Sequence, residues 1–146
     1  MQARTTILPK STPVFHHPIQ DIVMRLEPAT SNLDLVKDLV ITLKHIQDLA
    51  IYEREFALLV HYLVPQDMIY FFDHAVRLGI PVTDPVALHA SDLLLHSNRK
   101  VVGFVAEFLA SSANAFAHHC LKEALTKKPI HRDVIEEAID LFFLGD

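Results

Sequence analysis

The stretch SNRKVVGFVAEFLASSANAFAHHCLKEAL, residues 97–125, decides the fold class of this chain. Apolar or small residues recur in it every three or four positions, which is the spacing of a buried helical face. They include Val101, Val105, Phe108, Ser112 and Ala115. No proline interrupts residues 86–128, and proline is excluded from helix interiors. The stretch therefore predicts one long helix of about 27 residues, ending near Leu125.

A second proline-free window, residues 29–64, carries the same pattern. Its spacing predicts another long helix from about Asn32 to Leu59. Shorter helices are expected beside the long ones, over residues 19–27, 68–78, 85–96 and 134–144, because proline, glycine and capping residues mark their ends. Strand-like alternation is nowhere sustained in the sequence. The sequence therefore predicts an all-α protein.

The two halves of the chain share their helix-end signals at an offset of 66 residues. Identical residues fall where capping chemistry restricts the residue type, so we expect the two aspartates to cap the last helix of each half and the two glycines to close it. The offset indicates an internal repeat, with a coincidence of two generic helical halves as the alternative. The aligned residues are Ser31-Asn32 with Ser97-Asn98, Asp67 with Asp133, and Leu78-Gly79 with Leu144-Gly145.

The order of a short helix, a long helix and a third helix headed by aspartate resembles the histone fold. The segment KKPIHRDV, residues 127–134, is similar to the second loop of a histone, and residues 62–68 carry a weaker copy without a basic residue. Two copies on one chain resemble the fused pseudodimers, or histone doublets, of prokaryotes and viruses. The resemblance implies two histone folds, residues 18–79 and 80–146, in a handshake that forms one compact domain. A flexible leader of residues 1–17 would precede them.

The resemblance also implies DNA binding by paired loops, because the first loop of one histone fold lies beside the second loop of the other. The formal net charge of −5 differs from that of strongly basic histones, so we do not expect compaction of a genome. The first hypothesis is a non-enzymatic architectural or regulatory protein that contacts double-stranded DNA. The implied phosphate contacts are Ser31, Asn32, Arg99, Lys100, Lys127, Lys128 and Arg132.

A second hypothesis is a histone-fold subunit that binds protein partners without contacting DNA. The negative charge favours it, as does the apolar bulk of residues 70–72 and 139–144, which exceeds what two short helices bury alone. These third helices either seal the two halves together, which we favour, or associate with a partner or a second copy.

Catalytic and metal-binding classes have weaker support in the sequence. Only three glycines are present, which disfavours glycine-rich phosphate loops and dinucleotide fingerprints. His118 and His119 diverge by about 100° on a helix, so they form neither a metal site nor a thiol–base pair with Cys120, which we expect to be buried and structural. We predict no enzyme, metal or cofactor. A helical metalloenzyme that uses the ten histidines, including His89 and His96, is a third hypothesis.

The expected location is intracellular, in the cytoplasm, nucleoid or nucleus. A single cysteine excludes an intrachain disulfide and fits a reducing compartment. No run reaches the 18 or so apolar residues that a membrane span needs, and residues 1–17 lack an apolar stretch of signal-peptide length. We therefore expect no membrane association.

Overall fold

The computed structural model of the protein describes residues 14–28 and 30–142. Helices are the only regular secondary structure of these residues, which confirms the all-α prediction. None of these helices is long and apolar enough to cross a membrane. The elements are α2 (His17–Val23), α3 (Leu33–Lys44), α4 (Leu49–Tyr62), α5 (Pro65–Leu78), α6 (Asp84–Ser91), the 3-10 helix η2 (Asp92–Leu95), α7 (Arg99–Ala110), α8 (Ala115–Leu125) and α9 (Arg132–Phe142).

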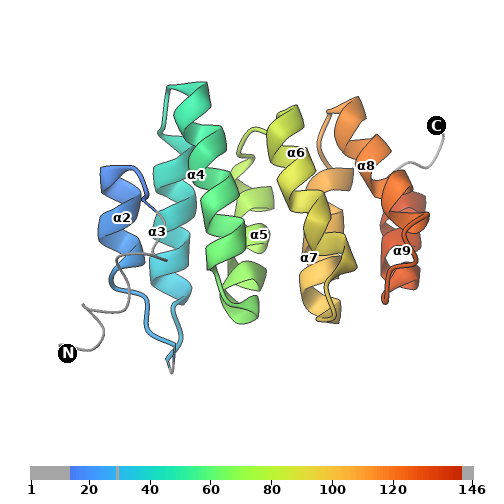
Figure 1. Ribbon diagram of the computed structural model, residues 1–146, viewed down its shortest axis with the longest axis horizontal. Helices are drawn as coiled ribbons and strands as arrows, with labels where there is room; N and C mark the ends of the chain where they lie inside the picture. Colours follow the sequence, from blue (N-terminus) through green and yellow to red (C-terminus); the bar gives the residue numbers. More distant parts are fainter. Residues whose placement is uncertain (1–13, 29, 143–146) are drawn as a thin grey trace.

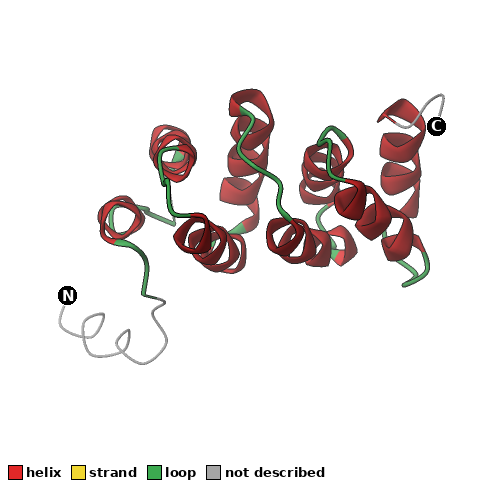
Figure 2. Cartoon of the chain, turned by 90° about the horizontal axis from the view of Figure 1, so that it is seen from above, coloured by secondary structure: helices red, strands yellow, loops and turns green. Residues whose placement is uncertain are grey.

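The helices are arranged in two layers along one long axis (Figure 1, Figure 2). α3, α5, α7 and α9 pack side by side in one layer, and α4, α6 and α8 form the other. α2 packs against α3 at one end of the array, and α9 closes the opposite end. Each helical hairpin thus buries its apolar side against the next, which is the arrangement of α-solenoids.

Each of the two predicted long helices is two helices. The prediction of one helix over residues 32–59 is wrong, because α3 ends at Lys44 and α4 begins at Leu49. The prediction over residues 98–125 is wrong in the same way, because α7 ends at Ala110 and α8 begins at Ala115. The apolar spacing continues on both sides of each break, so periodicity alone does not reveal it.

Capping side chains restart the helix after each break. The Asp48 carboxylate accepts a hydrogen bond from the Ile51 N–H at 3.0 Å. Asn114 Oδ1 accepts one from the Phe116 N–H at 2.7 Å. Such side chains satisfy N–H groups that the first turn of a helix leaves without a partner. Asparagine and aspartate, rather than proline, therefore divide the proline-free windows.

This helix order does not confirm the histone-fold pseudodimer. A handshake needs two uninterrupted long helices that cross. In the described part of the chain, each of the two expected long helices is divided into two shorter ones. Instead α3 packs on α5, α5 on α7, and α7 on α9. The two halves therefore bury their apolar faces along the array rather than around a crossing point.

Equivalent helices of the two halves nevertheless begin close to 66 residues apart, in agreement with the predicted offset. We call residues 17–78 the first unit and residues 84–142 the second unit. The predicted boundary between residues 79 and 80 lies in the link between α5 and α6. The paired helix starts are Leu33 and Arg99, Leu49 and Ala115, and Pro65 and Arg132, the last pair one residue beyond the offset.

Aromatic side chains join the two units at the centre of the core. Phe56 of α4, Phe71 and Phe72 of α5, and Phe108 of α7 are all buried. The rings of Phe56 and Phe108 stack with their centroids 5.8 Å apart, and Phe72 meets Phe108 edge-on at 5.2 Å. The aromatic residues of α5 thus seal the two units together, which is the role that we favoured. The same role predicted for the third helix of the second half is not seen in Leu141 and Phe142, which are exposed, and residues 143 and 144 lie outside the described residues.

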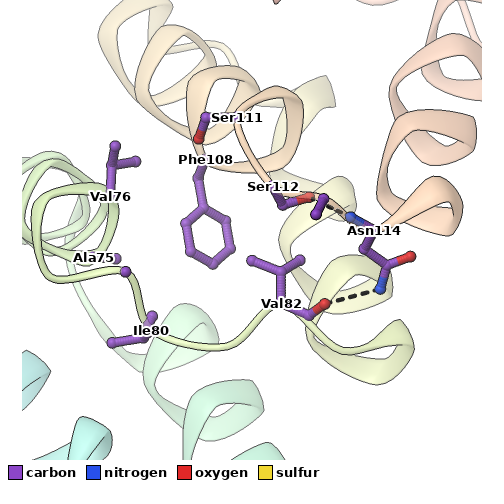
Figure 3. A pocket seen from close by; sticks show the side chains of 10 residues that line it. Ala75, Val76, Ile80, Val82, Phe108, Ser111, Ser112 and Asn114 are labelled. Atoms are coloured by element: carbon purple, nitrogen blue, oxygen red, sulfur yellow. Dashed lines mark hydrogen bonds between the residues drawn. The ribbon is translucent and has the colours of Figure 1, made fainter.

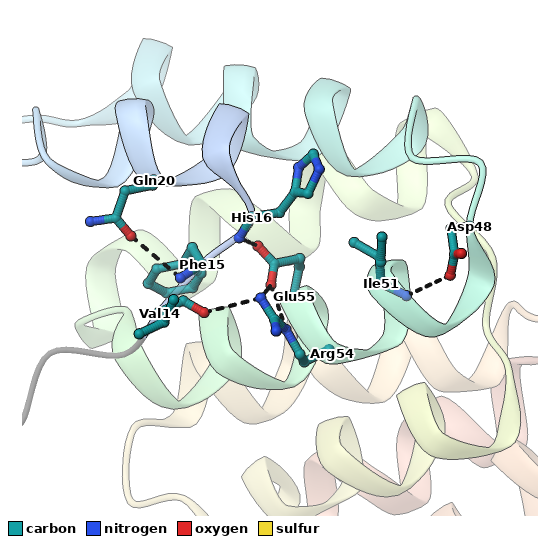
Figure 4. Close-up of polar contacts among 8 residues, drawn as sticks. All are labelled: Val14, Phe15, His16, Gln20, Asp48, Ile51, Arg54 and Glu55. Carbon is teal, nitrogen blue, oxygen red and sulfur yellow. Dashed lines mark hydrogen bonds and ion pairs between the residues drawn. The ribbon is translucent and has the colours of Figure 1, made fainter.

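Residues 14–16 are fixed against α4 before the first helix begins (Figure 4). Glu55 is a fully buried carboxylate on α4, and it accepts hydrogen bonds from the His16 N–H and from the Arg54 guanidinium. Arg54 Nη2 also donates to the Val14 carbonyl at 3.2 Å, and Phe15 is buried. Residues 14–16 of the predicted leader are therefore bonded to α4, and His17 begins α2, so the folded part extends ahead of the predicted boundary at residue 18. Residues 1–13 of the predicted leader lie outside the described residues.

Candidate functional site

A cavity of about 480 Å³ opens between α5 and α7, where the two units meet (Figure 3). Its walls come from the end of α5, the link of residues 79–83, the end of α7 and the loop of residues 111–114. Most of the lining is apolar, and the polar groups belong to the loop. The lining residues are Ala75, Val76, Gly79, Ile80, Val82, Phe108, Ser111, Ser112, Ala113 and Asn114.

Gly79 turns the chain at the cavity. It has a φ of 66° and a ψ of 44°, in the left-handed region that residues with a Cβ atom disfavour. Its N–H donates to the Ala75 carbonyl at 3.0 Å, which closes α5. The turn directs Ile80 into the core. Gly79 therefore has the helix-closing role predicted for it, whereas Gly145 lies outside the described residues.

Asn114 holds the α7–α8 loop against the link between the units. Its Nδ2 donates to the Val82 carbonyl at 2.8 Å and to Asp84 Oδ1 at 3.0 Å, while its Oδ1 caps α8. All four hydrogen-bonding positions of the amide are therefore engaged. Sequence analysis missed this residue, although Ser111-Ser112-Ala113-Asn114 ahead of a helix-forming segment is an N-cap signal.

The cavity is lined by apolar, hydroxyl and amide side chains. None of its residues is an aspartate, glutamate, histidine, lysine, arginine, cysteine or tyrosine, so it offers no general acid or base. Phe108 reaches from α7 toward Ile80 and Val82 and forms an apolar floor (Figure 3). An apolar floor with a few hydroxyl and amide groups at the rim suits an apolar group whose orientation is fixed by hydrogen bonds.

The five basic residues predicted to contact phosphate lie at one end of the second unit. α7 begins with Arg99 and Lys100, Lys127 and Lys128 follow the end of α8, and α9 begins with Arg132. Arg132 Nη1 donates to the Leu125 carbonyl at 2.8 Å, which ties the start of α9 to the end of α8. Because successive helices are antiparallel, these three helix ends meet, and the basic residues form one cluster.

Acidic side chains compensate part of this basic cluster. Arg99 donates two hydrogen bonds to Asp133, at 3.1 and 2.6 Å, and these raise the pKa of Arg99 and lower that of Asp133. Arg132 pairs with Glu136 at 3.1 Å. Within the described residues, Lys100, Lys127 and Lys128 have no ion pair. The cluster therefore offers three lysines to an anion, beside the carboxylates of α9.

The loops pair within each unit, so the predicted pairing across the two halves is wrong. His131 Nε2 donates to the Ser97 carbonyl at 2.7 Å, which joins two loops of the second unit. In the first unit Asn32 Nδ2 donates to Asp67 Oδ2 at 3.1 Å. α3 is separated from α9 by α5 and α7 in its layer, so Ser31 and Asn32 do not join the basic cluster.

Asn32 is a buried structural residue rather than a phosphate contact. Its side chain accepts from the Glu27 N–H at 3.0 Å and donates to the Glu27 carbonyl at 2.9 Å, in addition to its bond with Asp67. Burial raises the pKa of Asp67, and the hydrogen bond from Asn32 opposes that rise. Val64 rather than Asp67 is the N-cap residue of α5, so the cap prediction for Asp67 is wrong. Asp67 and Asp133 both lie in the first turn of their helices, and each reaches across to the start of a neighbouring helix.

Cys120 lies on α8 directly after His118 and His119. Cys120 is buried on α8, and its burial raises the pKa of the thiol, which suits a structural cysteine. His118 Nε2 donates to the Ser112 carbonyl at 2.8 Å, whereas His119 reaches Glu123 at 3.9 Å. The two imidazoles therefore point to different surroundings, as the helical spacing predicts.

Comparisons with known proteins assign no family to the chain. No family model matches it, and neither a curated protein nor a solved structure is significantly similar to it. The residues of the chain itself therefore supply the grounds for a function.

Proposed function

We propose that this chain is a non-enzymatic helical-array protein that binds a segment of a partner protein in the cavity between α5 and α7. The observation that carries this proposal is the composition of that cavity, which is apolar inside and has hydroxyl and amide groups at its rim. It keeps the protein-interaction class of the second hypothesis from the sequence, but without the histone fold and with the α5–α7 cavity in place of the third helices as the binding surface. No DNA contact is needed for it.

The dimensions of the cavity support a peptide anchor as its occupant. About 480 Å³ is within the usual range of ligand pockets, and it accommodates one or two large apolar side chains of a partner. Ser111 is exposed at the rim, where its hydroxyl can bond to the main chain of a bound segment. An apolar anchor in a pocket with polar groups around it is a common form of peptide recognition.

The position of the cavity within the array supports the same function. Stacked helical hairpins form extended surfaces that proteins of this architecture use for binding. The cavity lies at the junction of the two units, and the core aromatic Phe108 supports it from behind. A bound segment therefore meets a surface that the packed core supports.

The experiment is a selection of displayed peptides on the purified chain, followed by affinity measurements on two variants. Ser111→Trp places a bulky side chain at the rim of the cavity, and we expect it to weaken peptide binding by about tenfold or more. Ser31→Trp is the matched control, because Ser31 is exposed next to the start of α3 and does not line the α5–α7 cavity. The proposal is wrong if no peptide binds or if Ser111→Trp leaves the affinity unchanged.

DNA binding is the second candidate function, and the clustering of Lys100, Lys127 and Lys128 at one end of the second unit favours it. Three lysines give a weak, salt-sensitive attraction to phosphate, and the carboxylates of α9 oppose it. In gel-shift titrations at low salt, this function predicts that Lys127→Glu with Lys128→Glu abolishes binding. Ser111→Trp leaves DNA binding unchanged, so the same variants separate the two functions.

A further inference from the structure

His61, His89 and Asp92 come together where the two units pack against each other in the second layer. His61 lies in the last turn of α4, His89 in the last turn of α6, and Asp92 directly after α6. One ligand atom from each lies within 4.8 Å of the other two. The two imidazole rings are arranged in a T shape, with centroids 5.7 Å apart and an interplanar angle of 81°.

We propose that these three side chains bind a divalent transition-metal ion, with Zn²⁺ as the best match. Two imidazole nitrogens and one carboxylate oxygen form a ligand set that Zn²⁺ uses widely, whereas Mg²⁺ and Ca²⁺ prefer oxygen ligands alone. Three protein ligands leave the fourth tetrahedral position to water or to another ligand. The nitrogen-rich donor set therefore selects the class of ion.

The geometry needs only a small adjustment to accept the ion. Bonds of about 2.0–2.1 Å in a tetrahedron place ligand atoms roughly 3.3–3.5 Å apart. His61 and Asp92 are exposed and His89 is half-buried, so rotation about side-chain bonds can close the remaining gap without moving the helices. His89 and Asp92 are three residues apart, which places them on one face of the helical segment.

No competing interaction holds these side chains. Within residues 14–28 and 30–142, none of the three has a side-chain hydrogen bond or an ion pair with another residue. The two imidazole rings form a T-shaped contact beside the Asp92 carboxylate. The groups are therefore available as ligands.

Among the residues that the structure describes, the three-residue site lies at the junction of the units and is not repeated. The residue 66 positions after His61 is Lys127, and the residues 66 positions before His89 and Asp92 are Val23 and Leu26. The repeat therefore does not generate a second copy of the site. An ion bound here joins α4 of the first unit to α6 of the second, so it stabilises the folded array by binding the native chain in preference to the unfolded one.

The test is a titration of the full chain with Zn²⁺ and with Co²⁺, whose visible absorption reports tetrahedral coordination. We expect one ion per chain, intense Co²⁺ bands, and a higher melting temperature with Zn²⁺. His61→Ala and His89→Ala are each expected to weaken binding by more than tenfold, and Asp92→Asn to weaken it less. His119→Ala is the control, because His119 is an exposed histidine on α8 beside Glu123.

Two outcomes would overturn the proposal. The first is no uptake of Zn²⁺ or Co²⁺ by the folded wild-type chain at micromolar concentrations. The second is binding that His61→Ala and His89→Ala leave unchanged, which would place the ion elsewhere. If a variant does not fold, the imidazole NMR signals of His61 and His89 in the wild-type chain decide the matter, because a bound ion must shift both of them. None of these outcomes depends on peptide binding in the α5–α7 cavity.

Discussion

α5 and α9 are the last helices of the first and second units. Within their layer, α5 packs between α3 and α7, whereas α9 packs against α7 alone. Phe71 and Ala75 of α5 are buried. The residues 66 positions later are Glu137 and Leu141, and both are exposed. The last helix of an array must present a polar face to water, and the carboxylates of α9 provide one. Position in the array, rather than membership of the repeat, therefore sets these residue types.

The side-chain hydrogen bonds that join the starts of neighbouring helices also differ in burial between the two units. In the first unit, Asp67 is 5% exposed and accepts a hydrogen bond from Asn32, which is also buried. In the second unit, the Asp133 side chain is 65% exposed and forms its two hydrogen bonds with Arg99 in contact with water. The aspartates at equivalent positions of the repeat thus make a buried hydrogen bond with an amide in one unit and an exposed ion pair in the other. Water weakens the second link much more than the first.

The largest expected effect is the loss of an aromatic side chain from α5. Phe72→Ala removes a ring that packs on Phe56, Phe71 and Phe108, and we expect it to lower the free energy of unfolding by about 3–5 kcal/mol. Leu141→Ala on α9 is the control, because Leu141 is 70% exposed, and we expect a change within about 0.5 kcal/mol. Urea unfolding measures both. Equal losses would show that α9 is covered in solution as fully as α5.

A smaller effect is expected from the buried link of the first unit. Asp67→Ala leaves Asn32 Nδ2 without its acceptor on α5, which we expect to lower the free energy of unfolding by about 1–3 kcal/mol. Burial raises the pKa of Asp67. At pH values between the pKa of the unfolded chain and this raised pKa, the Asp67 carboxyl is protonated in the folded state and ionised in the unfolded chain. The contribution of Asp67 is therefore fully present below the aspartate pKa of the unfolded chain, and it falls as the pH rises through the raised pKa.

Urea unfolding from about pH 4 to about pH 8 checks this direction. The loss caused by Asp67→Ala is expected to be greater at the acid end. Asp67→Asn is the matched control, because it keeps an oxygen for Asn32 and cannot ionise. A loss for Asp67→Ala that grows with rising pH would contradict the buried environment of this carboxyl.

The smallest effect is expected from the exposed link of the second unit. Asp133→Ala removes the ion pair with Arg99, and its cost should be below that of Asp67→Ala and should decrease further as salt screens the pair. The pKa of Asp133 is lowered by Arg99, so its stabilisation is present above the ordinary aspartate range and is lost as the pH falls through the lowered pKa. The two aspartates thus have opposite pH trends. If the loss in the free energy of unfolding caused by Asp133→Ala does not depend on salt, the link in the second unit is not a solvent-exposed ion pair.

Part of the fold and little of the candidate site could be predicted from the sequence. Asn98, Gly79 and the prolines mark helix ends correctly, because capping and excluded dihedral angles are local properties. Asn32 also precedes α3, but its side chain makes no cap hydrogen bond. The breaks at Asp48 and Asn114 were missed because the apolar spacing continues through them, although their capping side chains were visible in the sequence. The cavity and the His61–His89–Asp92 cluster were not predictable, since each joins residues from helices distant in sequence.

The sequence by itself determined that the chain is helical, that its helix-end signals recur at an offset of 66 residues, and where several helices end, because these depend on side-chain periodicity and on hydrogen bonds within a few residues. Only the tertiary structure decided that the helices stack in two layers and that α9 rather than α5 faces water. Amphipathic helices can bury the same apolar face against many different neighbours, so the choice of neighbour depends on packing across the whole chain.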